Sequence, residues 1–319
     1  MITSLWVLEV LVCFLMYAVL DGYDLGVGVA VLFERDGGRK RSMVESVAVG
    51  WDGNETWLVL GVISLWAGFP LAFGTILPHA YLPLVVVLLS LIVRGVSVEL
   101  VSQSSSLTRR WTTAFGWASL LASFAQGFAL GTLTSLGSMN LFCVLSGLTV
   151  TAAYLALGYA YTKRKSSGSM RKKAGRRGRI ATAVMAALLI EVLFSISSTA
   201  APLNLHSPAR VSAFAVLLLF AVGGVVAALV TFTRDRRPSA DTVPIGGLIV
   251  AVVSVLLALV VARYPVLLPP NLTVDAAVSP RNTMLFVLIG IGLLNMPLVL
   301  AYNVFAHRVF RGKLEGGDS

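Results

Sequence analysis

Long apolar stretches alternate with short polar ones along the whole chain, in the pattern expected of membrane-spanning helices. Crossing a bilayer takes about 20 mostly apolar residues. Windows of that kind cover residues 5–32, 53–74, 79–101, 112–134, 139–161, 180–201, 210–232, 244–264 and 283–305. We therefore predict an all-α integral membrane protein with nine transmembrane helices, forming a single polytopic domain over residues 1–319.

The composition supports this class. Hydrophobic residues make up 57% of the 319 residues and charged residues only 13%. A soluble protein of this length would need more charge to cover its surface, whereas lipid-facing helices can turn apolar side chains outward. The two cysteines, Cys13 and Cys143, lie in apolar runs and are interpreted as buried thiols. The three histidines are scattered, so neither residue type predicts a metal site.

The net charge of +10 could indicate a nucleic-acid partner, but the distribution of the charges argues against one. All but four of the 25 lysines and arginines fall in alternate connections and in the C-terminal tail. The longest of these connections, residues 162–179, is basic with glycine and serine, and we expect it to be flexible. By the positive-inside rule this side faces the cytoplasm, which places the N-terminus outside and the C-terminus inside. The basic runs then act as topology determinants and lipid contacts.

Charged residues inside the predicted spans are the best candidates for function, because burying charge in lipid is costly. The first span contains Asp21 and Asp24 on one face, and the third contains Arg94. Counting about 1.5 Å of rise per residue places all three at similar depth. We predict an ion pair between Asp24 and Arg94, with Asp21 as the second choice of partner. A purely structural bridge is the alternative interpretation of such a pair.

Two glycines, Gly22 and Gly26, lie four residues apart beside these aspartates. That spacing favours the close approach of another helix.

A run of carboxylates continues from this depth toward the inner surface. Asp52 and Glu55 begin the second span, and Glu99 ends the third. Together with Asp21 they form a candidate proton pathway, since chains of acidic groups are typical of proton relays in membranes. A simpler interpretation remains open, in which Asp52 and Glu55 only cap and charge the start of a helix.

Four segments resemble one known family, the subunit II of bacterial cytochrome bd-type quinol oxidases. They are Asp21–Gly28, Trp51–Leu58, Arg94–Glu99 and Gln126–Gly131, and they occur in the order that the family has them. The resemblance extends over nearly the whole chain. Val101 departs from it, because the family's segment carries a second arginine at this position.

The resemblance implies a terminal oxidase of the bacterial cytoplasmic membrane that oxidises quinol and reduces oxygen to water. It implies nine spans arranged as two four-helix bundles plus one peripheral helix. Two b-type haems, one d-type haem and the quinol site would belong to a partner, subunit I, and this chain would bind no haem itself. Asp52 would line a cytoplasmic proton route, and Asp24 and Arg94 would hold the region that faces the partner's haems. Small single-span accessory subunits and a structural quinone are also compatible with the family.

Two alternatives remain open at this point. A proton-coupled secondary transporter would also bury carboxylates and an arginine. It should show repeat-related broken helices and a binding site near the bilayer midplane, whereas these charges gather toward one side. An assembly scaffold with purely structural ion pairs is the other alternative.

Overall fold

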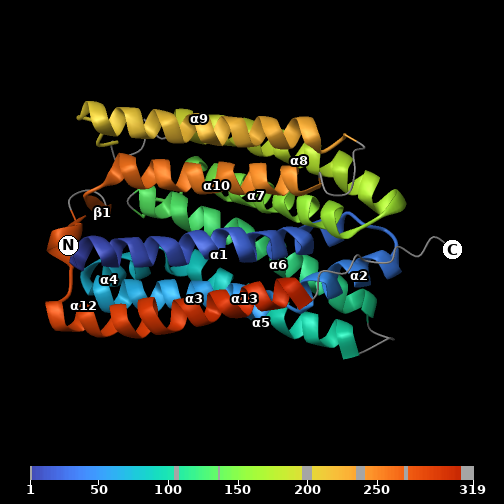
Figure 1. Cartoon of the computed structure of the whole chain (residues 1–319), viewed down its shortest axis with the longest axis horizontal. Helices are drawn as coiled ribbons and strands as arrows, with labels where there is room; N and C mark the ends of the chain where they lie inside the picture. The colour runs from blue at the N-terminus through green and yellow to red at the C-terminus, as the bar shows by residue number, and fades with distance from the viewer. Residues whose placement is uncertain are drawn as a thin grey trace.

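The structure is a computed structural model, and it shows an elongated bundle of helices that run along one axis (Figure 1). It describes residues 2–103, 108–135, 137–195, 203–234, 241–268 and 272–309. The helices of the first half are α1 (Ile2–Leu32), α2 (Gly37–Ala48), α3 (Trp51–Gly68), α4 (Pro70–His79), α5 (Tyr81–Gln103), α6 (Thr108–Thr134) and α7 (Leu141–Lys165). Those of the second half are α8 (Gly168–Ser195), α9 (Pro208–Thr231), α10 (Thr242–Arg263), α11 (Val274–Ala277), α12 (Arg281–Val287), the π-helix η3 (Leu288–Asn295) and α13 (Met296–Val309).

Within these described residues, 8 helices are long and apolar enough to cross a membrane, or up to 9 if one bent pair counts as a single span. The chain is thus an all-α membrane protein with eight or nine candidate spans. The bent pair is α3 and α4, which meet at 118° where the sequence predicted one continuous span. Pro70 explains the break, because the residue before a proline is pushed out of the helical region. Phe69 accordingly has φ −134° and ψ 63°.

The corner between α3 and α4 is fixed from two sides. The indole of Trp6 lies against Gly68, where a Cβ atom would sit 1.9 Å from the indole nitrogen. Ser279 closes the other side, donating its amide to the Gly68 carbonyl at 2.8 Å and its hydroxyl to the Ala67 carbonyl at 2.6 Å. The two Ser279 hydrogen bonds satisfy carbonyl groups that the helix end would otherwise leave without a partner.

The connections hold more structure than the hydropathy pattern predicts. The expectation of a flexible segment at residues 162–179 is wrong, because α7 continues to Lys165 and α8 begins at Gly168. A short antiparallel pair, β1 (Val266–Leu268) and β2 (Leu272–Thr273), lies between α10 and α11. Local hydrogen bonding and ion pairs, invisible to a hydropathy window, stabilise these connections.

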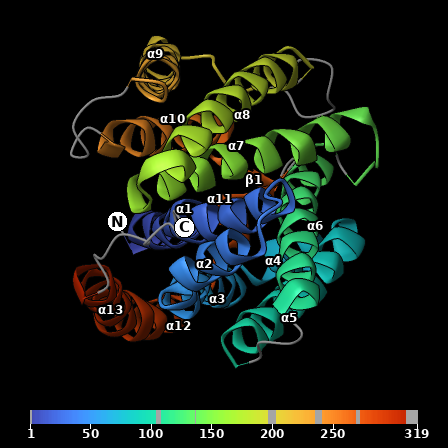
Figure 2. The ribbon, with the colours of Figure 1, turned by 90° about the vertical axis from the view of Figure 1, so that its right-hand side faces the viewer.

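The first helix lies at the centre of the bundle (Figure 2). α1 packs against α3, α6 and α7, while α5 pairs with α6, α7 with α8, and α9 with α10. A close approach joins α1 to α7, where Gly26 meets Gly158 and neither helix has room for a side chain. The predicted close approach at Gly22 and Gly26 is therefore confirmed, and α7 is the helix that makes it.

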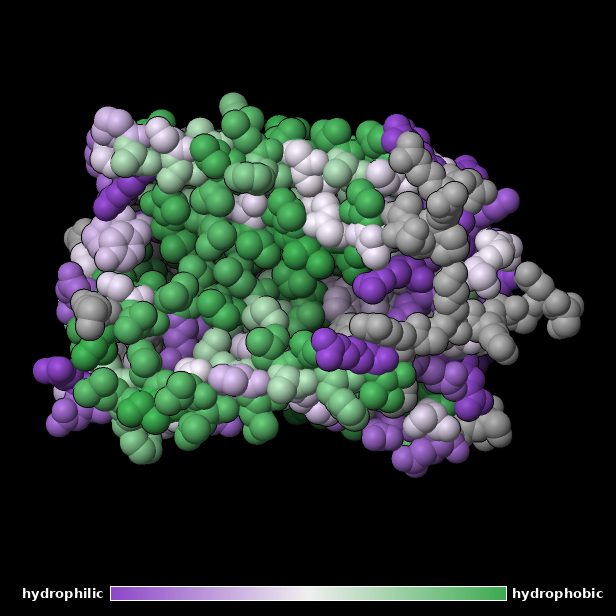
Figure 3. Space-filling view, viewed as in Figure 1, coloured by the Kyte–Doolittle hydropathy of each residue, from purple (hydrophilic) through white to green (hydrophobic). Residues whose placement is uncertain are grey.

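On the face shown in Figure 3, apolar residues cover the middle of the molecule and hydrophilic residues gather at its two ends. Helices α1, α5, α7 and α13 all end at the same end of the molecule. We call it the basic end, because the clusters of lysine and arginine lie there. It is on the right in Figures 1 and 3.

Candidate functional site

Arg94 and Asp21 form a buried ion pair between α5 and α1. The guanidinium nitrogens donate to both carboxylate oxygens of Asp21, at 3.0 Å and 2.5 Å, and both side chains are fully buried. The first-choice prediction of an Asp24–Arg94 pair is therefore wrong, and the second choice holds. Trp51 covers the guanidinium, with its ring centroid 5.9 Å away, and Gly95 leaves space for this ring. A bidentate arginine–carboxylate pair is among the strongest charge-assisted contacts in proteins.

Asp24 is held instead by a neutral amide. Asn54 on α3 donates to one Asp24 oxygen at 2.7 Å and lies 3.0 Å from the Tyr23 hydroxyl. Its own oxygen accepts a hydrogen bond from Asn303 on α13 at 2.7 Å, and Asn303 in turn accepts one from Trp57. Asn54 thus links α1, α3 and α13. Sequence reasoning gave Asn54 no role, although an amide inside the acidic start of the second span was a usable signal.

A second polar group lies beside Asp21. Gln126 on α6 donates to the Tyr17 hydroxyl at 2.7 Å and accepts from the Tyr154 hydroxyl at 3.1 Å. Three helices therefore contribute hydrogen-bonding side chains around the ion pair. Hydrogen-bond networks of this kind fix helix positions in a low-dielectric interior.

The remaining predicted carboxylates lead from this ion pair to the basic end. Glu55 is half-buried on α3, where its charge interacts with those of Arg94, Asp21 and Asp52. Asp52 and Glu99 are exposed, and their charges interact with each other. The structure thus brings the four predicted pathway residues Asp52, Glu55, Asp21 and Glu99 into one region.

Three buried polar atoms of this region have no hydrogen-bond partner within the described residues. They are one carboxylate oxygen of Asp24, one of Glu55 and the Nε atom of Arg94. Buried polar atoms are nearly always satisfied by protein or ordered water. We therefore expect ordered water molecules between Glu55, Arg94 and Asp24.

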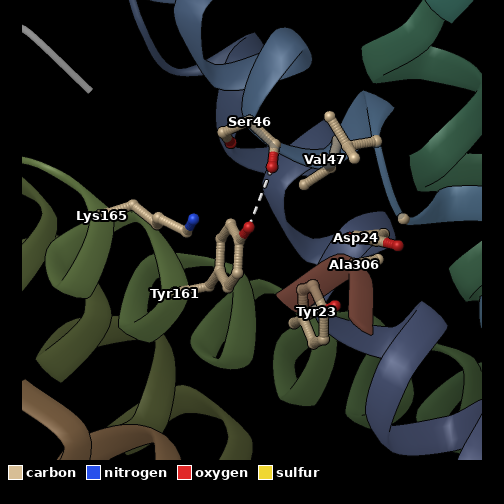
Figure 4. A pocket seen from close by; sticks show the side chains of 9 residues that line it. Tyr23, Asp24, Ser46, Val47, Tyr161, Lys165 and Ala306 are labelled. Atoms are coloured by element: carbon tan, nitrogen blue, oxygen red, sulfur yellow. Dashed lines mark hydrogen bonds between the residues drawn. The ribbon is translucent and has the colours of Figure 1, made fainter. Parts of the chain in front are cut away.

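A small cavity of about 30 Å³ reaches Asp24 from the side of α2 and α7 rather than from the side of Glu55 and Asp52 (Figure 4). Tyr23, Ser46, Tyr161 and Lys165 line it, and the Tyr161 hydroxyl donates to the Ser46 carbonyl at 2.9 Å. A space of this size holds about one water molecule. It provides polar surroundings between Asp24 and the basic end, along α2 and α7.

Two further acids order the basic end outside the spans. Asp241 is buried against Arg171 and Lys163, at 2.7 Å and 3.1 Å, and although burial acts to raise its pKa, these cations hold the pKa below its ordinary value. Burial also opposes ionisation of Glu34, but the backbone amides of Arg35 and Asp36 donate to its carboxylate and leave the pKa lowered. Part of the basic sequence thus forms ion pairs within the protein.

One buried acid that lies inside a predicted span was also missed by the sequence analysis. Glu9 on α1 is 6% exposed and accepts a hydrogen bond from the Ser64 hydroxyl at 3.0 Å. Its other oxygen faces Gly292 of η3 and has no partner in the described chain. An acidic residue within the first apolar window was the signal that could have revealed it.

The described residues contain no group of three or more His, Cys, Asp or Glu side chains that could hold a metal ion. His79, at the end of α4, is bonded through its ring nitrogen to the Thr75 carbonyl of its own helix. Cys13 and Cys143 are buried and free. The expectation that haem belongs to a partner subunit stays a prediction.

Comparison with known proteins identifies relatives over the whole chain. The chain is 23% identical to the cytochrome bd-I ubiquinol oxidase subunit 2 of Escherichia coli, over 98% of this chain and 95% of that one. It is 29% identical to the cytochrome bd ubiquinol oxidase subunit 2 of Bacillus subtilis, in a match that spans 60% of each chain.

A solved structure supports the same fold. The bd oxidase from Geobacillus thermodenitrificans contains a chain that superposes with a TM-score of 0.80 at 14% identity, covering 96% of this chain and 98% of that one. The family model for cytochrome bd terminal oxidase subunit II matches residues 2–310. The chain therefore belongs to the cytochrome bd terminal oxidase subunit II family.

Proposed function

We propose that this chain acts in a bacterial cytoplasmic membrane beside a haem-carrying subunit I, in a complex that oxidises quinol and reduces oxygen to water. Membership of the subunit II family implies the partner, and the names of the relatives from E. coli and B. subtilis give ubiquinol as their substrate. The same membership favours the oxidase subunit over a secondary transporter. The specific contribution proposed for this chain is a cytoplasmic proton route, together with support for assembly.

The proposed orientation places the basic end in the cytoplasm and the N-terminus outside, because lysine and arginine collect on the cytoplasmic side of membrane proteins. The proposed division is into one bundle of α1, α3–α4, α5 and α6, and another of α7, α8, α9 and α10. Pairs α1–α3, α1–α6 and α5–α6 pack within the first and α7–α8 and α9–α10 within the second, while α7 also packs on α1 and α6 and so joins the two. The helix formed by α12, η3 and α13 lies at the edge and is the candidate for the peripheral span (Figure 2).

One observation carries the proton route: the charges of Asp24 and Glu55 interact with the Asp21–Arg94 pair, and each of these two acids has one buried oxygen without a partner in the described residues. Asp52 and Glu99 can collect protons at the basic end, because both are exposed there. Glu55 is half-buried and can accept a proton from them through water. Asp21 cannot easily take part as a proton carrier, because protonation would leave Arg94 buried without its counter-ion. Its proposed role is to hold Arg94, whose charge favours a carboxylate at Glu55.

In such a complex, the haems of subunit I would supply the chemistry of oxygen reduction. The residues of this chain hold and orient groups next to that partner. Arg94 is fixed by Asp21, and Asp24 is fixed by Asn54, so both contribute a rigid polar interior on which the partner can assemble. Small accessory subunits and a structural quinone are proposed on the family resemblance alone.

The test uses the assembled complex, purified through a tag on this subunit. A reduced-minus-oxidised optical spectrum with b-type and d-type haem bands, and quinol-dependent oxygen uptake, are expected. We expect Glu55→Gln to slow oxygen reduction by about 100-fold while leaving the haem bands intact. This is the lower end of the range for removing a proton-transfer group. Asp52→Asn should have a smaller effect, because Glu99 lies close enough to replace it.

Glu45→Gln provides the matched control, since Glu45 is a partly exposed acid of the basic end that pairs with Arg41. Its oxygen uptake should equal that of the unmodified complex. If the Glu55→Gln and Asp52→Asn complexes assemble and turn over normally, the scaffold hypothesis is correct and the proton route is wrong. A haem-free preparation from cells that make subunit I would overturn the oxidase proposal itself.

A further inference from the structure

A groove of about 360 Å³ lies between α1, α7 and α13 and extends to the basic end of the molecule. The groove forms because α13 packs against α3, whereas α7 packs against α1 and α8. The parts of α7 and α13 near the basic end therefore stay apart. The groove is separate from the small cavity beside Asp24, although Tyr161 and Lys165 line both.

The groove changes chemistry along its length. Its deeper part is lined by Met16 and Leu20 from α1 and by Leu300 and Val304 from α13. At the basic end it is lined by three cations, Arg164, Lys165 and Arg308, and no carboxylate is among the residues that line it. Arg164 and Arg308 are exposed, and neither forms an ion pair with a carboxylate of the described chain. An apolar slot below a rim of one charge sign is complementary to an amphipathic anion.

The dimensions fit the same kind of ligand. Arg164 and Lys165 are the last two residues of α7, and Arg308 lies in the last turn of α13. The three cations therefore lie at the depth of lipid headgroups. Leu300 lies eight residues before Arg308, which corresponds to roughly 12 Å along the helix axis. A phosphate at the rim would therefore leave the first part of an acyl chain beside Leu300 and Met16.

We propose that this groove binds one anionic phospholipid, with its phosphate against Arg164, Lys165 and Arg308 and an acyl chain along Met16, Leu20, Leu300 and Val304. Basic pockets between transmembrane helices on the cytoplasmic side are suited to anionic headgroups. The lipid fills the space that α13 leaves beside α1 and α7, and thereby fixes α13, which carries Asn303 to the Asn54 network. A zwitterionic lipid would lack the net charge that the rim selects, and a quinone would give Arg164 and Arg308 no anionic partner.

The test measures lipid retention by the complete oxidase complex, reconstituted in bilayers of phosphatidylcholine and phosphatidylglycerol, extracted in mild detergent and examined by native mass spectrometry. We expect one phosphatidylglycerol to be retained. The double variant Arg164→Gln/Arg308→Gln should weaken its binding by about 25-fold, because each cation near the membrane surface contributes roughly a factor of five. The matched control is Arg109→Gln/Arg110→Gln, which removes the same charge at the same end but outside the groove, and it should retain the lipid.

Val304→Trp supplies a second variant, which fills the groove without changing charge and should also displace the phosphatidylglycerol. This variant keeps the proposal testable if the double variant fails to assemble. The proposal would be overturned by equal retention of phosphatidylcholine or by a quinone in place of the lipid. It would also be overturned if neither Arg164→Gln/Arg308→Gln nor Val304→Trp reduced phosphatidylglycerol retention. Lipid retention does not depend on turnover, so this outcome is distinct from failure of the proton route.

Discussion

The two halves of α1 bury their acids in different surroundings. Residues 21–31 are all buried, and here Asp21 has Arg94 and Asp24 has Asn54 as partners from other helices. Residues 2–20 bury one face at helical spacing, including Trp6, Glu9 and Cys13. Glu9, the one acid of that stretch, has only the Ser64 hydroxyl as its side-chain partner in the described chain. In the enclosed half Asp21 is thus compensated by a charge and Asp24 by an amide hydrogen bond, because a surrounded helix can receive partners from several directions.

The largest expected effect comes from breaking the enclosed pair. Asp21→Asn leaves the guanidinium of Arg94 buried without a counter-ion, which typically costs about 3–5 kcal/mol. We expect poor assembly of the complex and a strongly lowered midpoint of thermal unfolding. The combined variant Asp21→Asn/Arg94→Met should recover part of the loss, since it removes both charges together. If the single and combined variants are equally stable, the pair does not hold this half of α1.

The exposed pair Arg41–Glu45 serves as the control for this experiment. Its side chains are 39% and 43% exposed, and exposed pairs contribute about 0–1 kcal/mol. Glu45→Gln should therefore leave the unfolding midpoint almost unchanged.

The enclosure itself can be disturbed without touching a charge. A Cβ atom on Gly26 would lie 1.7 Å from the Tyr154 carbonyl oxygen, so Gly26→Ala must separate α1 from α7. Overpacking of this kind typically costs about 1–3 kcal/mol, and we expect a clearly lowered unfolding midpoint. Gly290→Ala is the matched control, because its Cβ atom would meet open space on η3. Equal effects of the two substitutions would mean that close helix contact does not stabilise the enclosed half.

Sequence reasoning located this charged region but could not resolve its contacts. Depth counting correctly placed Asp21, Asp24 and Arg94 together, because rise per residue is nearly constant in a helix. The choice between Asp21 and Asp24 rests on only about 4.5 Å of rise and on how each helix is rotated. The partner of Asp24 comes from α3, and a hydropathy window gives neither the rotation of that helix nor the break that ends it before Pro70. Glu9 went unnoticed because it lies outside the acidic motifs.

Asp241 sharpens the comparison, because it is a buried acid with two cations but lies at the basic end near water. Asp241→Asn should lower stability by about 1–2 kcal/mol, less than Asp21→Asn, since Lys163 and Arg171 can regain hydration more easily than Arg94. The lowered pKa of Asp241 means that its contribution is present above its ordinary value of 3.8 and is lost as pH falls through the folded-state pKa.

The difference in unfolding midpoint between the unmodified complex and Asp241→Asn should thus stay constant between about pH 5 and pH 7. It should shrink only in more acidic buffer, below roughly pH 4. A difference that already disappears near pH 6 would show that another group, rather than the Asp241 carboxylate, provides the stabilisation. Thermal unfolding across this pH series is the measurement.

Glu9→Gln should have the smallest effect. Glutamine keeps the volume of the side chain and an oxygen that can accept the Ser64 hydrogen bond, and no described cation would lose a partner. We expect a change below about 1 kcal/mol, in the range of substitutions that create neither a cavity nor an unpaired charge. A loss comparable to that of Asp21→Asn would show instead that Glu9 balances a positive group outside the described chain. The difference between the two halves of α1 would then disappear, because each would hold a compensated charge.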